Sequence, residues 1–196
     1  MDGGGRSLGA RVLLALISAG TMSRGDLGER LGLSAATTTR TVRPLIESGL
    51  IEERPPVEVG GPGRPTRLLA VASNSATVAG IKLTADRLYV VLTDPLGEVL
   101  IGDSLPLTET DAGSVTALIA SVVARLAERS GRRPDAIGIS LGAAVVGRRT
   151  VAVASFLGWR DVSLAAMVTE ATGLPCAVAN DVRAFAYAEA WFGAGR

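Results

Sequence analysis

The spacing of apolar residues changes near residue 72, and this change constrains the fold more than any other feature of the chain. Before it, apolar side chains recur at helical spacing, as at Leu13, Leu16 and Ile17. After it, the segments 77–83 and 87–94 have the character of strands bounded by turn residues. We therefore expect an α/β protein with two domains, one spanning residues 1–72 and the other residues 73–196.

The second domain is expected to alternate strands with helices after an antiparallel meander. Its third meander strand is predicted at 98–104, and the residues that follow favour a long amphipathic helix at 114–130. The remaining expected elements are a strand at 136–141, a less regular stretch at 145–154, a helix at about 162–172, a strand at 175–179 and a helix at 181–192.

Composition excludes several kinds of chemistry. The chain has no histidine and a single cysteine, Cys176. Histidine-dependent nucleophiles, histidine metal sites, cysteine-rich zinc clusters and an intramolecular disulfide are therefore excluded. The longest uncharged stretch, residues 68–81, is shorter than the roughly 20 apolar residues of a membrane-spanning helix. We expect a cytoplasmic protein with no membrane partner, no metal and no cofactor.

The segment from Ser23 to Gly49 predicts a helix-turn-helix. Ser23 can cap a short helix, with Asp26 three residues on as a variant of the capping box. Gly32 provides a tight turn, and Ser34 can cap a second helix that runs to about residue 48. Two helices joined by a short glycine-containing turn form this motif.

The second helix has one face suited to DNA. Thr38, Val42, Leu45 and Ile46 would face the core, whereas small and basic residues fall mostly on the other side. Small side chains allow close approach to the major groove, arginine reaches guanine or phosphate, and a capped helix start suits a phosphate. The candidate DNA contacts are Ser34, Ala35, Thr37, Thr39, Arg40 and Arg43. The alternative is a surface helix that is rich in threonine and arginine without binding DNA.

A hairpin follows the helices and predicts a wing. Two short strands at 50–54 and 66–71 flank a Pro/Gly-rich loop whose tip contains Arg64 between glycine and proline. An arginine on a narrow, extended peptide suits the electronegative minor groove. The alternative is an ordinary loop with a solvated charge. With the helix-turn-helix, the hairpin makes a winged helix.

At these residues the chain resembles a known family. The DNA-binding domain of ROK (repressor, open reading frame, kinase) transcriptional regulators is similar to Leu31-Gly32-Leu33-Ser34, the run from Arg40 to Ile51, and Gly63-Arg64-Pro65. The remainder resembles the first lobe of the ROK actin-like ATPase fold, most specifically at Gly158-Trp159-Arg160-Asp161-Val162 and at Asn180-Asp181 with Glu189-Ala190-Trp191-Phe192-Gly193. The resemblance implies a winged helix-turn-helix followed by this lobe, and it covers nearly the whole chain.

The resemblance also implies a sugar site. In family kinases the Asn-Asp pair orients sugar hydroxyls and provides the general base, and these residues match Asn180 and Asp181. The alternative is that either residue caps the helix that follows. The family's phosphate loop, Asp-x-Gly-Gly-Thr, is replaced at 82–86 by Lys-Leu-Thr-Ala-Asp, which should approach phosphate poorly. The family's Pro-Gly after the buried strand is Gly142-Ala143 here.

The resemblance implies a DNA-binding transcriptional regulator and a repressor of carbohydrate-related genes. Because the phosphate loop of the family kinases is replaced, we expect no enzyme activity. Its expected partners are a double-stranded operator, a sugar or sugar-phosphate effector and a second copy in a homodimer. The family's second lobe would begin where the chain stops, so we expect an incomplete lobe. The alternatives are a sugar kinase that uses Asp181 as its base, and an inactive fragment or interaction module.

Overall fold

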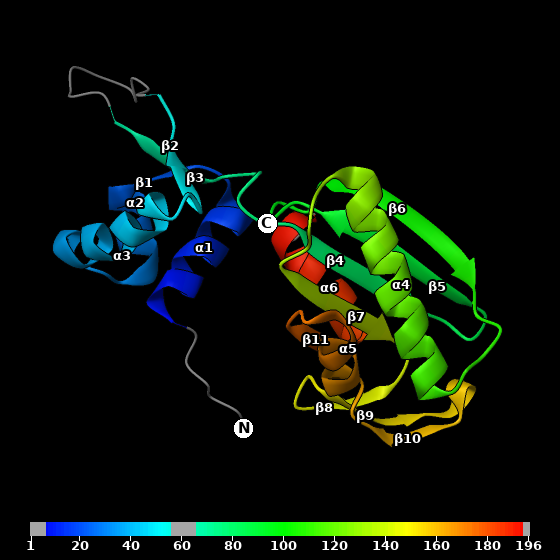
Figure 1. Ribbon diagram of the computed structural model, residues 1–196. Coiled ribbons are helices and arrows are strands. Elements are labelled where there is room, and N and C mark those ends of the chain that lie inside the picture. Colours follow the sequence, from blue (N-terminus) through cyan, green and yellow to red (C-terminus); the bar gives the residue numbers. More distant parts are fainter. Residues whose placement is uncertain (1–6, 56–65, 194–196) are drawn as a thin grey trace. The chain divides into compact units, whose positions relative to one another are not determined.

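A computed structural model describes residues 7–55 and 66–193, and the chain divides into two compact units (Figure 1). One unit comprises residues 1–75 and 190–196, and the other comprises residues 76–189. The fold is α/β, as the sequence predicts. Among the described residues, no helix has both the length and the apolar character needed to cross a membrane.

The first unit is a helix-turn-helix with a small antiparallel sheet. Its elements are α1 (Leu8–Ala19), β1 (Met22–Ser23), α2 (Arg24–Leu31), α3 (Ala35–Glu47), β2 (Ile51–Glu53) and β3 (Leu68–Val71). The strand order is β1-β3-β2, so β3 pairs with both of the others. The two-residue strand β1 was not predicted. The fully buried side chains of this unit include Val12, Leu16, Leu27, Val42, Ile51 and Leu69.

Local signals explain where α2 and α3 begin and end. The Ser23 hydroxyl accepts the Asp26 amide at 3.1 Å, and Asp26 accepts the Ser23 amide at 3.4 Å, which confirms the predicted capping box. Gly32 ends α2 with φ +67°, a conformation that glycine adopts without steric cost. Ser34 then caps α3 by accepting the Thr37 amide at 3.2 Å.

The second unit is built on a five-stranded mixed sheet with the order β11-β7-β4-β5-β6. Its strands are β4 (Val78–Leu83), β5 (Arg87–Thr93), β6 (Val99–Pro106), β7 (Ala136–Leu141) and β11 (Cys176–Asn180). Strands β4 to β6 form the predicted antiparallel meander, while β4, β7 and β11 run parallel. The carboxyl ends of the three parallel strands therefore meet at one edge of the sheet.

Helices α4 (Ala112–Ser130) and α5 (Leu164–Thr172) pack against each other beside the sheet, and Figure 1 shows α4 lying across it. The buried side chains of α4 recur at helical spacing and meet the alternate residues of the strands. The core includes Trp159 and the aliphatic residues Ile81, Leu83, Leu88, Leu92, Ile119, Leu126, Ile139 and Leu141.

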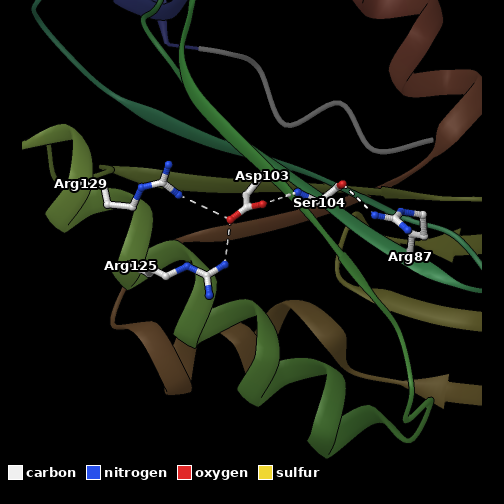
Figure 2. Close-up of polar contacts among 5 residues, drawn as sticks. All are labelled: Arg87, Asp103, Ser104, Arg125 and Arg129. Carbon is white, nitrogen blue, oxygen red and sulfur yellow. Dashed lines mark hydrogen bonds and ion pairs between the residues drawn. The ribbon is translucent and has the colours of Figure 1, made fainter.

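A charged cluster fastens the edge strand β6 to α4. Figure 2 shows Asp103 between two arginines of α4: its carboxylate lies 2.9 Å from Arg125 Nη2 and 3.6 Å from Arg129 Nη1. The next residue, Ser104, accepts a hydrogen bond from Arg87 Nη2 at 3.0 Å. A charged residue held on the inner face of an edge strand discourages pairing with a foreign strand.

The stretch at 145–154, to which the sequence pattern assigns no definite element, is a hairpin of a second small sheet. It contains β8 (Ala144–Val146) and β9 (Thr150–Ala154), joined by a turn in which Gly147 and Arg148 both have φ +59°. A short helical turn, η1 (Ser155–Leu157), leads to β10 (Trp159–Val162), which was not predicted. Its Arg-Asp pair breaks the apolar alternation expected of a strand. The last helix, α6 (Asp181–Phe192), buries none of its described side chains.

Candidate functional site

The exposed face of α3 carries small side chains beside two arginines. Ala35 and Thr39 are both exposed and lie one turn apart, while Thr38 and Val42 on the opposite side are fully buried. Leu45 and Ile46 are half-buried, so the predicted core face of this helix is confirmed. A helix with small side chains on its outer face can approach a groove closely.

The two arginines of α3 differ in their partners. Arg40 is exposed and forms no hydrogen bond or ion pair with any residue that the structure describes. Arg43 Nε donates to Glu47 Oε1 at 2.7 Å, and this hydrogen bond raises the pKa of Arg43 above its ordinary value. Arg40 is therefore the cation on this face that is most available to an anionic partner.

The start of α3 is partly occupied by its own contacts. Ser34 is exposed, but its hydroxyl caps the helix and lies 2.9 Å from Thr37 Oγ1. Thr37 is half-buried, so its hydroxyl is less accessible than that of Thr39. A phosphate at this position would compete with, or extend, an existing network of hydroxyl groups.

An ion-pair cluster joins α2 to the base of the hairpin. Glu53 of β2 accepts from Arg24 Nη2 at 2.5 Å and from Arg67 Nη1 at 3.0 Å. The hydrogen bond from Arg24, and to a smaller extent that from Arg67, holds the pKa of Glu53 below its ordinary value. Sequence patterns gave no signal for Arg24 and Glu53, because the contact joins residues 29 positions apart. The predicted contact Arg64 lies outside the described residues.

The second candidate site lies at the edge where the parallel strands end. Asn180 accepts the amides of Val182 and Arg183 at 3.0 and 3.3 Å, so it caps α6, the alternative role considered from the sequence. Its amide group also donates to the Ala143 carbonyl at 3.2 Å. Asn180 thereby links the end of β11 to the turn after β7.

Asp181 forms fewer hydrogen bonds to described residues than Asn180 does. One of its carboxylate oxygens accepts the Val182 amide at 2.8 Å. The other faces the turn after β7, where a Cβ placed on Gly142 would lie 3.7 Å away. The same position lies 4.0 Å from a ring carbon of Phe156, and no described residue donates a hydrogen bond to this second oxygen of Asp181. The structure therefore brings Asp181 and Gly142 together at the edge, as the parallel order predicts.

The turn at 82–86 is closed on itself. The Thr84 amide donates to the Arg87 carbonyl at 3.0 Å, and the Thr84 hydroxyl lies 3.0 Å from Asp86 Oδ1. Phosphate loops instead present unbonded backbone amides to the ligand. This turn thus offers neither the glycines nor the free Thr84 amide that a phosphate loop requires.

Comparisons with known proteins give a matching family model in each of the two units. The family model described as "ROK family" matches residues 78–196, and the one described as "MarR family" matches residues 10–60. A transcriptional regulator of Mycobacterium tuberculosis is 32% identical over 97% of this chain and 44% of its own length. A xylose repressor of Caldicellulosiruptor bescii is 27% identical over 93% of this chain and 47% of its own. The chain thus spans just under half the length of these relatives.

Solved structures give the same result. The crystal structure of a ROK family transcriptional regulator, a homologue of the Escherichia coli Mlc protein, matches 93% of this chain and 48% of its own with 29% identity and a TM-score of 0.75. A ROK family glucokinase from Streptomyces griseus, in complex with glucose and AMPPNP, matches 61% of this chain and 38% of its own with 30% identity and a TM-score of 0.56. The fold is therefore a winged helix-turn-helix followed by the first lobe of the ROK actin-like fold, and the chain belongs to the ROK family.

Proposed function

We propose that the chain is a sequence-specific DNA-binding transcriptional regulator that acts as a repressor of carbohydrate-related genes. The observation that carries the proposal is the outer face of α3, where Ala35 and Thr39 leave room for a groove and Arg40 is unpaired among the described residues. Relatives named as transcriptional regulators and xylose repressors, which align over most of this chain, support it. Such a protein acts in the cytoplasm, where the operator is.

The proposed interface comprises Ser34, Ala35, Thr37, Thr39, Arg40 and Arg43 of α3, with Arg64 on the wing. Arg40 and Thr39 would read base edges, because the first half of a recognition helix enters the major groove. Ser34 would receive a backbone phosphate at the helix start. Arg43 would exchange Glu47 for a phosphate, and Arg64 would enter the minor groove beside the site.

A binding titration tests this interface. Fluorescence anisotropy would be measured on duplexes from upstream of the protein's own gene and on scrambled duplexes, at 50 to 200 mM salt. Arg40→Ala should cost ~1–3 kcal/mol on the specific duplex and relax the preference at one base pair. Arg30→Ala is the matched control, because Arg30 is also exposed in the same unit but lies on α2. Without a salt-sensitive, sequence-selective complex of the parent chain, the proposal is refuted.

A second part of the proposal concerns the effector. We propose that the sheet edge contributes Asn180 and Asp181 to the binding of a sugar or sugar phosphate. The second carboxylate oxygen of Asp181 supports this, since no described residue donates to it and a carboxylate oxygen can accept a sugar hydroxyl. Calorimetric titration with xylose, glucose and their phosphates should give heats that Asp181→Asn abolishes. Unchanged heats in that variant would remove Asp181 from the site.

The rival function is a sugar kinase that uses Asp181 as its base. The closed turn at Thr84 argues against it, because its amide is already bonded within the chain. Incubation with ATP and the same sugars should release no ADP above background. Turnover that disappears in Asp181→Asn would overturn the non-enzymatic proposal. Gel filtration with light scattering, with and without operator, tests the proposed homodimer.

A further inference from the structure

The Glu53 carboxylate sits at the base of the wing and holds two arginines at once. Arg24 comes from the first turn of α2, and Arg67 precedes β3, so one carboxylate joins the helix-turn-helix to both sides of the hairpin. Three quarters of the Glu53 side chain is withdrawn from solvent, with 25% exposed. Ion pairs of this kind are more rigid than fully exposed ones, because several contacts share one ordered side chain.

Arg24 also borders the proposed DNA surface. A hollow of about 150 Å³ lies between the start of α2 and the start of α3. Its lining comprises Arg24, Gly25, Gly28, Leu33, Ala35 and Thr39. Ala35 and Thr39 are two of the proposed groove-facing residues of α3. Arg24 is therefore next to the part of α3 that would meet DNA.

The contact with Glu53 leaves Arg24 able to bind a second anion. A guanidinium has five N–H donors, and the contact at 2.5 Å to Glu53 Oε1 uses one of them. The Arg24 side chain remains 36% exposed. A planar cation fixed on one side and open on the other is suited to a phosphate, because the orientation is set before the ligand arrives.

We propose that Arg24 is a further DNA-contacting residue, which binds a backbone phosphate beside α3, and that Glu53 is the positioning residue that aims it. The inference rests on the proposed DNA-binding function and adds a phosphate contact outside the recognition helix. Phosphate contacts of this kind fix the orientation of a protein on the duplex without reading its sequence. Through Glu53, the same contact fixes the base of the wing relative to α2.

Because Glu53 is charged, the direction in which its substitution changes DNA affinity tests the positioning role. Glu53→Gln keeps the size of the side chain and removes one negative charge near the DNA surface. Electrostatics alone would then predict tighter binding, since DNA is a polyanion. Loss of positioning predicts the opposite, because glutamine has a single uncharged acceptor oxygen and cannot hold both guanidiniums as the two carboxylate oxygens do. The two explanations therefore differ in direction.

The experiment uses the full chain and the same specific and scrambled duplexes. Arg24→Ala should weaken binding to both by a similar factor and reduce the slope of log K against log salt by about 1. Arg24→Lys should keep that slope, because the charge remains, while losing affinity. Glu53→Gln should bind at least about threefold more weakly than the parent. Arg129→Ala is the control, because it removes one ion-paired arginine from the other unit.

Each outcome decides one statement. A slope unchanged in Arg24→Ala would remove Arg24 from the phosphate contacts. Equal or tighter binding by Glu53→Gln would refute the positioning role. Circular dichroism of every variant checks that the helices are intact, and Arg24→Lys is the variant least disruptive to folding. Absence of any selective complex with the parent chain would instead refute the proposed function and, with it, this inference.

Discussion

Because α2 and α3 approach each other closely, we expect one glycine-to-alanine substitution in α2 to lower the stability of the fold instead of raising it. Gly28 lies inside α2, where replacement of glycine by alanine ordinarily stabilises a helix by about 0.5–1 kcal/mol. A Cβ at Gly28, however, would lie 2.9 Å from Thr38 Oγ1 and 3.1 Å from the Leu33 carbonyl oxygen. Both distances are shorter than a relaxed carbon–oxygen contact. We therefore expect Gly28→Ala to destabilise the helix-turn-helix.

The magnitude depends on whether the two neighbours can move. Thr38 is fully buried, and its hydroxyl is held by the Ser34 carbonyl at 3.1 Å. Leu33 contributes a backbone atom, and its amide is bonded to the Gly28 carbonyl at 2.8 Å. Neither can rotate away, so the cost is that of overpacking, about 1–3 kcal/mol. After the helix-propensity gain is subtracted, a net loss of roughly 1 kcal/mol is expected.

Gly25 provides the matched control within the same helix. A Cβ there meets only Ser23 Oγ at 3.5 Å, an ordinary contact. Gly25→Ala should therefore be neutral or stabilising by up to about 1 kcal/mol. The two substitutions are chemically identical and lie three residues apart, so opposite effects can only come from their surroundings.

Hydrogen exchange read by mass spectrometry is the suitable assay. Residues 1–75 contain no tryptophan, tyrosine or phenylalanine, so helices α2 and α3 carry no intrinsic fluorophore of their own. A loss of 1 kcal/mol should lower the protection of the α2 and α3 amides by roughly fivefold. Protection in Gly28→Ala equal to or above that of the parent would refute the reasoning, whatever Gly25→Ala does. The displaced α3 should also bind the specific duplex more weakly.

Three further predictions concern the cores and the titrating groups. Leu126→Ala should destabilise the second unit by about 2–5 kcal/mol in urea unfolding, because the side chain is fully buried in its core. Burial raises the pKa of Cys176 from 9.0 to about 11, so its thiolate fraction at pH 8 should be roughly a hundredfold below that of an ordinary thiol. Its initial rate with a disulfide reagent should be lower than that of an ordinary thiol, by a smaller factor than the fraction, and should recover on unfolding. Hydrogen bonds, the strongest of them from Arg24, hold the pKa of Glu53 in the folded protein below its usual 4.5. The ionised carboxylate therefore stabilises the fold fully above pH 4.5, and this contribution to the free energy of unfolding is lost as the pH falls through the lower folded pKa. Thermal melts between pH 3 and 6 should show this loss in the parent and a flatter profile in Glu53→Gln.

The parts of the fold that could be predicted are those encoded by neighbouring residues. The capping box of Ser23 and Asp26, the turn at Gly32 and the cap at Ser34 each act over three or four positions. The buried alternation of β4 and β5 is equally local, since every second residue faces the core. These signals place the winged helix and the meander within a few residues of their observed bounds.

The features that could not be predicted depend on distant partners. Strand β1 exists because Met22 and Ser23 pair with β3. Two residues are too few to show the alternation of apolar and polar side chains by which a strand is predicted. β10 pairs with β9 although Asp161 adopts φ +50°, which no strand pattern would suggest. The ion pair of Arg24 with Glu53 likewise needs the hairpin to be folded first. Sequence patterns predicted which side of α3 is buried, but they did not predict the contact of Arg24 with Glu53.

The Asn-Asp pair combines the helix cap that the structure shows at Asn180 with the ligand-binding role that we propose for Asp181. Asn180 already accepts two amides of α6 and donates to the Ala143 carbonyl, so most of its hydrogen-bonding capacity is used within the chain. The second carboxylate oxygen of Asp181 lies near Gly142, and no described residue donates a hydrogen bond to it. Substitution of Asn180 should therefore loosen the start of α6 and the turn after β7 even without a sugar, whereas Asp181→Asn should leave both in place and alter only effector binding. Hydrogen exchange of α6 without ligand separates the two cases. Equal loss of protection in both variants would mean that the pair acts as a single cap.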